Sequence, residues 1–76
     1  MTITNVPDPR DLTLARWGAE LALQDGGVPL AAGPDWRRWA ATVANYANFG
    51  AQNLPDPYQF ADWRTWAMAL KKAANK

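Results

Sequence analysis

Proline and glycine residues divide this chain into three short segments, and that division limits which folds it can adopt. Residues 8–11 (DPRD) predict a helix start, because aspartate side chains accept hydrogen bonds from the free amides of a first turn and proline fits its first position. Residues 26–27 (GG) can end that helix, since glycine readily takes the left-handed conformation found there. Residues 33–35 (GPD) and 56–59 (DPYQ) predict two further starts, and Gly50 ends the second segment.

The expected helices span about residues 9–25, 34–49 and 57–74. We expect no strands, because no stretch shows sustained alternation of apolar and polar positions with β-branched residues. The prediction is a single small helical domain of the all-α class over residues 1–76. Its three helices, joined by Pro/Gly-rich linkers, would form either a small bundle or an open helical arrangement that a partner completes.

Two related segments suggest a weak internal repeat. NVPDP at 5–9 and NLPDP at 53–57 each precede a helix in which a tryptophan is followed by a leucine four residues later. Pro-Asp-Pro opens helices well on its own, which is the simpler explanation; the alternative is a duplicated unit. A second pair, DWRRWA at 35–40 and DWRTWA at 62–67, shares its tryptophan spacing more than its charge pairing.

The Trp-x-x-Trp spacing of this second pair predicts part of the core. At about 100° per residue, two indoles three residues apart lie on neighbouring parts of one helical face. Two such helices can pack with their rings edge to face. The expected core residues, which include large apolar side chains of all three helices, are Leu12, Leu23, Trp36, Trp39, Val43, Phe60, Trp63 and Leu70.

The first helix is apolar over more than half of its circumference. Leu12 and Leu23 lie on one side of it, and Trp17 and Leu21 lie on nearly the opposite side. Such a helix needs apolar contacts on more than one side, and we do not expect two other helices to cover all of it. Tryptophan is enriched at interface hot spots, and five tryptophans exceed what so short a chain needs. We therefore predict a protein interface formed by Leu14, Trp17, Leu21, Arg64, Trp66 and Met68.

Composition excludes several kinds of site. The 76 residues include no cysteine and no histidine, so neither a disulfide nor a thiolate or imidazole metal site can reinforce the small core. Assembly is the reinforcement that remains. The chain also has no serine, no carboxylate pair, no nucleophile–base arrangement and no phosphate-binding glycine loop. We expect no enzymatic activity, no metal and no cofactor.

The formal net charge of +1 argues against a chain that neutralises phosphates. The basic residues of the helices point around them rather than along one groove, and the aromatic residues fall on the apolar faces. Nucleic acid is therefore not an expected partner. No stretch is long and apolar enough for a membrane-spanning helix, and the first residues do not resemble a signal peptide. We expect a cytoplasmic chain with no membrane partner.

Three stretches, PDPRDLTLARWGAEL, GPDWRRWAATVANY and PDPYQFADWRTWAMAL, resemble the small helical proteins encoded among the virion genes of tailed bacteriophages. The likeness lies in Pro/Asp-rich turns that lead into tryptophan-bearing amphipathic helices, and no functional residues carry over. The resemblance implies a non-enzymatic structural or adaptor subunit of the tail, fibre or head, located in the virion and assembled in the host cytoplasm. Its partners would be other proteins of the assembly, copies of itself, or both.

The alternative function is a small regulatory binding module, such as a phage-encoded inhibitor of a host protein or a helical nucleic-acid-binding domain. A helix-turn-helix motif joins its helices by three or four residues, whereas the expected linkers here have about seven or eight. The sequence therefore favours the docking protein over the nucleic-acid-binding domain.

Overall fold

The computed structural model describes residues 3, 5–31, 35–49 and 53–74, which form three α-helices and two short 3₁₀ turns. The helices are α1 (Leu14–Gln24), α2 (Trp36–Tyr46) and α3 (Trp63–Ala74), and the turns are η1 (Pro9–Asp11) and η2 (Pro57–Gln59). No strand occurs within the described residues. The expected all-α fold is confirmed.

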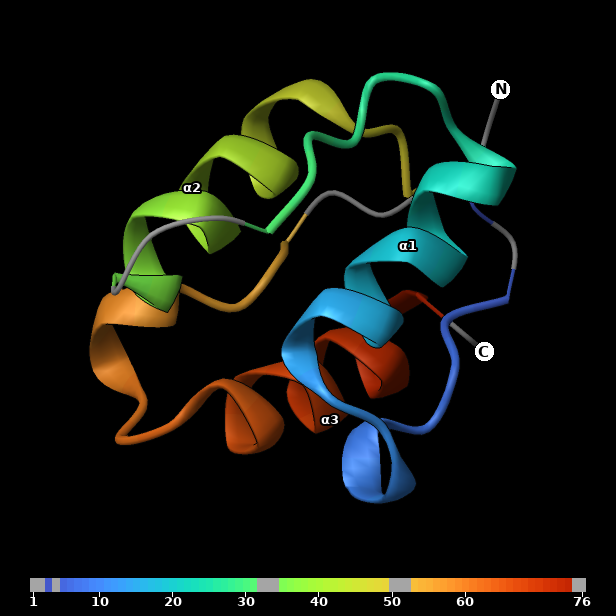
Figure 1. Cartoon of the computed structure of the whole chain (residues 1–76). Coiled ribbons are helices and arrows are strands. Elements are labelled where there is room, and N and C mark those ends of the chain that lie inside the picture. Colours follow the sequence, from blue (N-terminus) through green and yellow to red (C-terminus); the bar gives the residue numbers. More distant parts are fainter. Residues whose placement is uncertain (1–2, 4, 32–34, 50–52, 75–76) are drawn as a thin grey trace.

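The three helices lie roughly along the sides of a triangle around a common core (Figure 1). The N-terminal segment, which we define as residues 3 and 5–8, runs beside α1 and leads into η1 (Figure 1). The principal extents of the molecule are 27, 24 and 22 Å, so no direction is strongly elongated. The helices therefore close on one another rather than lying open in a row.

The first predicted helix is two elements, because the sequence holds two caps. Asp8 caps η1 by accepting a hydrogen bond from the Arg10 N–H at 2.9 Å. The backbone is extended at Leu12, and Thr13 then caps α1 by accepting from a backbone N–H three residues later. The helix expected from residue 9 therefore begins at Leu14.

The third predicted helix divides in the same way. Asp56 caps η2, the backbone is extended at Phe60, and Asp62 accepts from the Thr65 N–H at 2.7 Å at the start of α3. The prediction of one continuous helix from residue 57 was wrong, because this second cap satisfies the free amides of a new helix start.

The second predicted helix is shorter than expected. Asp35 caps it by accepting from the Arg37 N–H at 3.1 Å, and it ends at Tyr46, three residues before the expected end at 49, because the backbone becomes extended at Ala47. The predicted start at 33–34 and the predicted stop at Gly50 lie outside the described residues.

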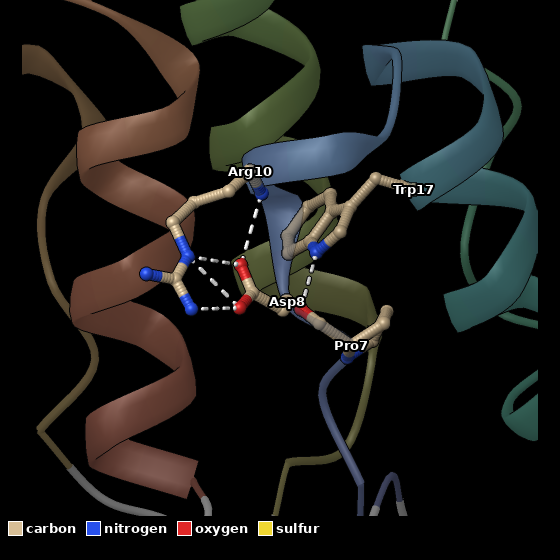
Figure 2. Close-up of polar contacts among 4 residues, drawn as sticks. All are labelled: Pro7, Asp8, Arg10 and Trp17. Carbon is tan, nitrogen blue, oxygen red and sulfur yellow. Dashed lines mark hydrogen bonds and ion pairs between the residues drawn. The ribbon is translucent and has the colours of Figure 1, made fainter.

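Three tryptophans share one hydrogen-bonding arrangement, in which an indole N–H reaches back to the carbonyl of a proline before the helix. Trp17 Nε1 donates to the Pro7 carbonyl at 2.9 Å (Figure 2). Trp39 Nε1 donates to the Pro29 carbonyl at 2.8 Å, and Trp66 Nε1 donates to the Pro55 carbonyl at 3.1 Å. Each proline precedes its tryptophan by 10 or 11 residues, so the same contact recurs in three parts of the chain.

These three indoles form a closed triangle at the centre of the core. Ring centroids are 6.0 Å apart for Trp17 and Trp39, 5.5 Å for Trp17 and Trp66, and 6.4 Å for Trp39 and Trp66. The interplanar angles of 70°, 75° and 77° make every pair edge-to-face, which is the geometry that the ring quadrupoles favour. Trp17 and Trp66 are fully buried and Trp39 is 6% exposed.

The same positions recur around each central tryptophan. A valine or leucine precedes each proline, a small buried residue follows each tryptophan, and a buried aliphatic residue stands four positions after it. The small residues are Gly18, Ala40 and Ala67, and the aliphatic residues are Leu21, Val43 and Leu70. Most of the core therefore comes from three related units, at 6–21, 28–43 and 54–70. The sequence suggested two copies of this unit, the first and the third. The copy at 28–43 was not predicted, because its proline, Pro29, is not part of a Pro-Asp-Pro motif.

Candidate functional site

An arginine ties the second unit to the third. The Arg37 guanidinium lies over the ring of Trp36, 4.9 Å from its centroid. Its Nη2 donates to the carbonyls of Phe60 and Ala61, at 2.7 and 3.2 Å. Beneath the guanidinium, the Trp36 ring lies 6.1 Å from Trp66 of the third unit. Arg37 is therefore a clamp between units, held by a cation–π contact and two charge-assisted hydrogen bonds.

A second arginine ties the third unit to the first by the same arrangement. The Arg64 guanidinium lies 4.7 Å from the centroid of Trp63, and its Nη2 donates to the Leu12 carbonyl at 3.0 Å. Trp63 in turn packs 5.8 Å from Trp17. The Trp-Arg pairs of the two repeated hexapeptides could have predicted these clamps. The prediction from sequence assigned these residues only to helix faces. In α1 the equivalent position, two residues before Trp17, is occupied by Ala15, so the first unit has no arginine for a clamp there.

A carboxylate joins the end of α1 to the end of α2. Asp25 follows α1 directly, and its Oδ1 accepts from the Gly27 N–H at 2.9 Å. Its Oδ2 accepts from the Asn48 N–H at 2.8 Å, just beyond α2. These bonds, that to Asn48 first and that to Gly27 second, hold the pKa of Asp25 below its usual value. We call this set of three residues the Asp25 junction; the sequence was interpreted at this point only as a helix stop.

Four large apolar side chains of the described residues are strongly exposed, and they lie near this junction or on η2. Leu23 is 82% exposed in the last turn of α1, and Tyr46 is 74% exposed as the last residue of α2. Leu30 is 76% exposed, three residues after Gly27, where an added Cβ would lie 3.0 Å from the Tyr46 carbonyl oxygen. Tyr58 of η2 is 61% exposed. Three of these four side chains therefore come from segments that meet at the Asp25 junction.

The structure corrects most of the predicted interface. Trp17, Leu21 and Trp66 are fully buried, because the N-terminal segment and the two other helices cover the side of α1 that was expected to face a partner. Leu14 and Met68 are partly buried. Arg64 is exposed, but its guanidinium is held by the contacts described above.

The predicted core divides into three groups. Trp39, Val43 and Leu70 are buried. Partly buried residues that pack against them are Leu12, Trp36, Phe60 and Trp63. Leu23 was wrongly assigned to the core: because α1 begins at Leu14 and not at residue 9, Leu12 and Leu23 do not share a helical stripe, and the side of α1 that carries Trp17 faces inward.

Charged pairs on the surface have local roles. The Asp8 carboxylate accepts from Arg10 Nε and Nη2, at 3.0 and 2.7 Å, beside the bond from Trp17 to Pro7 (Figure 2). The Arg10 side chain, followed by the Arg10 backbone N–H, lowers the pKa of Asp8. Hydrogen bonds from the Thr65 side chain, and then from its backbone, lower the pKa of Asp62. Both carboxylates are also helix or turn caps, so the backbone N–H groups that they accept from add to these shifts.

The described residues hold neither a cluster of metal ligands nor a membrane-spanning helix. They contain no group of three or more Asp, Glu, His or Cys side chains that could hold a metal ion. Within the same part of the chain, no buried side-chain nitrogen or oxygen lacks a hydrogen-bond partner. None of the described helices has the length and apolar character needed to cross a bilayer.

Comparison with known proteins adds no relative: no family model matches the chain, and no curated protein or solved structure matches it significantly.

Proposed function

We propose that this chain is a non-enzymatic structural or adaptor protein that docks onto a larger protein assembly. The observation that carries the proposal is the exposure of Leu23, Leu30 and Tyr46 on segments that meet at the Asp25 junction. Large apolar side chains that share one region of a small protein are typical of protein contact sites. The proposed docking surface therefore lies at the joined ends of α1 and α2, and not on the tryptophan face of α1 that was predicted from the sequence.

The closed core supports a rigid docking subunit. The central tryptophans are engaged with one another, and the two arginine clamps hold the units around them. A partner would therefore meet a preformed surface, which reduces the entropy lost on binding. The resemblance of the three helical stretches to virion proteins of tailed bacteriophages supports a tail, fibre or head accessory role as the particular assembly.

The arginine geometry weighs against the nucleic-acid-binding alternative. Arg37 and Arg64 donate to backbone carbonyls of neighbouring units, and Arg10 and Arg16 pair with carboxylates. Side chains engaged in this way are poorly placed to neutralise phosphates. A regulatory protein that binds a host protein remains the second candidate, because the same apolar surface would serve it.

Site-specific photocrosslinking in the native host cell tests the proposal. A photoreactive phenylalanine analogue replaces Leu23 or Tyr46 in two variants, and replaces the exposed polar residues Arg38 or Thr65 in two controls. We expect the first pair to give adducts with one defined protein, or with a second copy of the chain, and the controls to give none. Mass spectrometry of the adduct separates a virion protein from a host regulatory target. Equal labelling at all four positions, or none at 23 and 46, would refute docking through this surface.

A further inference from the structure

The Asp25 junction also reaches the N-terminal segment. Asn48, whose N–H donates to Asp25, accepts a hydrogen bond from the Ile3 N–H through its carbonyl at 2.6 Å. One residue just beyond the end of α2 therefore links the Asp25 carboxylate to the N-terminal segment. A change at Asp25 therefore affects the hydrogen bonds that hold both the end of α2 and the N-terminal segment.

The neighbouring side chain on α1 holds the same segment. Gln24 Oε1 accepts from the Asn5 N–H at 3.2 Å, and Gln24 Nε2 donates to the Asn5 carbonyl at 2.5 Å. Ile3 and Val6 are fully buried, so the segment covers part of the apolar core. Its Pro7 carbonyl accepts the indole N–H of Trp17. The N-terminal segment is thus a strap over the core, fixed from the end of α1.

The connections made by Arg37, Arg64 and Asp25 differ in their response to acid. Arg37 and Arg64 make theirs with guanidinium groups, which stay charged at any pH that a folded protein tolerates. Asp25 makes its connection with a carboxylate, which accepts both hydrogen bonds only while it is ionised. Acid therefore affects the connection between α1 and α2 and leaves the other two intact.

We propose that Asp25 is an acid-sensitive latch: protonation of its carboxylate releases the end of α2 and the N-terminal strap, while the third unit stays folded. The added proton converts one acceptor oxygen into a donor that faces a backbone N–H. Release of the strap uncovers the apolar side chains of Ile3 and Val6. The latch thus changes the apolar surface near the docking residues.

The direction of the pH effect follows from the hydrogen bonds. They lower the pKa of Asp25 below its usual value of 3.8, so its stabilising contribution is complete above that value and is lost as the pH falls through the lower folded pKa. Of the other ionisable residues on the elements around Asp25, Glu20 and Asp8 each pair with an arginine, and Tyr46 lies at the end of α2.

Hydrogen exchange of the three indole N–H groups in the intact chain tests the latch. Trp17 bonds to Pro7 on the strap, Trp39 bonds to Pro29 just after the junction, and Trp66 bonds to Pro55, remote from both. Between about pH 6 and about pH 2, we expect the protection factors of Trp17 and Trp39 to fall several-fold, because the Asp25 carboxylate is protonated only below its lowered pKa. Trp66 should change little and serves as the internal control.

The Asp25→Asn variant should show low protection at Trp17 and Trp39 at both pH values, because its amide keeps one acceptor oxygen and does not titrate. The matched control, Asp62→Asn, removes an exposed carboxylate cap and should retain the wild-type pH response of Trp17. A parallel fall at all three indoles of the wild-type chain would show general acid unfolding and overturn the latch. Wild-type behaviour of Asp25→Asn would overturn it as well. Should that variant not fold, the ratio of Trp17 to Trp66 protection in the wild-type chain still decides the question.

Discussion

Replacement of Trp17 by alanine gives the most direct test of the tryptophan triangle. Trp17 is fully buried, and its ring contacts those of Trp39, Trp63 and Trp66. Truncation of a buried tryptophan to alanine costs about 3–5 kcal/mol in general. The loss here should fall at the upper end, because each aromatic contact contributes about 0.5–1.5 kcal/mol beyond burial. The change also leaves the Pro7 carbonyl without its donor.

A core of this size supplies a stability of about 3–5 kcal/mol, so Trp17→Ala should leave most of the chain unfolded at 25 °C. Far-ultraviolet circular dichroism during a urea titration measures this directly. Trp17→Phe, which keeps a ring but loses the N–H, should remain folded with a stability lowered by about 2 kcal/mol.

Leu23→Ala is the matched control, since it truncates an apolar residue of the same helix that is 82% exposed. Its free energy of unfolding should stay within about 0.5 kcal/mol of the wild type. The reasoning fails if Trp17→Ala unfolds cooperatively at the wild-type urea midpoint, or if Leu23→Ala is the more damaging of the two. Either result would mean that the tryptophan side of α1 does not face the core.

Three further predictions concern packing, the clamps and pH. Gly18→Ala should lower the stability by about 1 kcal/mol, because the new Cβ would lie 2.8 Å from Trp39 Cζ2 and the strain exceeds the gain in helix propensity. Gly26→Ala is the control, since no atom lies within 4 Å of a Cβ added there, and equal urea midpoints for the two variants would contradict the prediction. Arg64→Ala should lower the free energy of unfolding by about 1–2 kcal/mol in chemical denaturation. Arg64→Lys should recover only part of this stability, since lysine lacks the planar group that lies over the Trp63 ring. Full recovery by lysine would exclude the stacked clamp. Because the pKa of Asp62 is lowered, its contribution to stability is present above pH 3.8 and is lost as the pH falls through the folded pKa. Acid titration by NMR should show a depressed midpoint for Asp62 that returns towards the usual value in Thr65→Ala. An unchanged Asp62 midpoint in that variant would refute Thr65 as the cause.

Local sequence determined the number of helices and much of their extent. The caps, prolines and glycines act on neighbouring backbone groups, so their positions predicted three helical segments. The double caps were also visible, in Thr13 after Asp8 and in Asp62 after Asp56. Their consequence was not predicted, because whether a helix continues through a second cap depends on what the intervening residues, such as Leu12 and Phe60, pack against.

Tertiary structure decided which side chains are inside. Helical periodicity establishes that Trp17 and Leu23 point in different directions, but it does not state which of these directions another segment covers. That choice was made by contacts between residues far apart in the chain: Arg64 with Leu12, Asp25 with Asn48, and the three central indoles with one another. Burial depends on the sum of such distant contacts, whereas propensity and capping depend on near neighbours. For that reason the sequence alone revealed the helices and much of the core, but not which side of α1 faces that core.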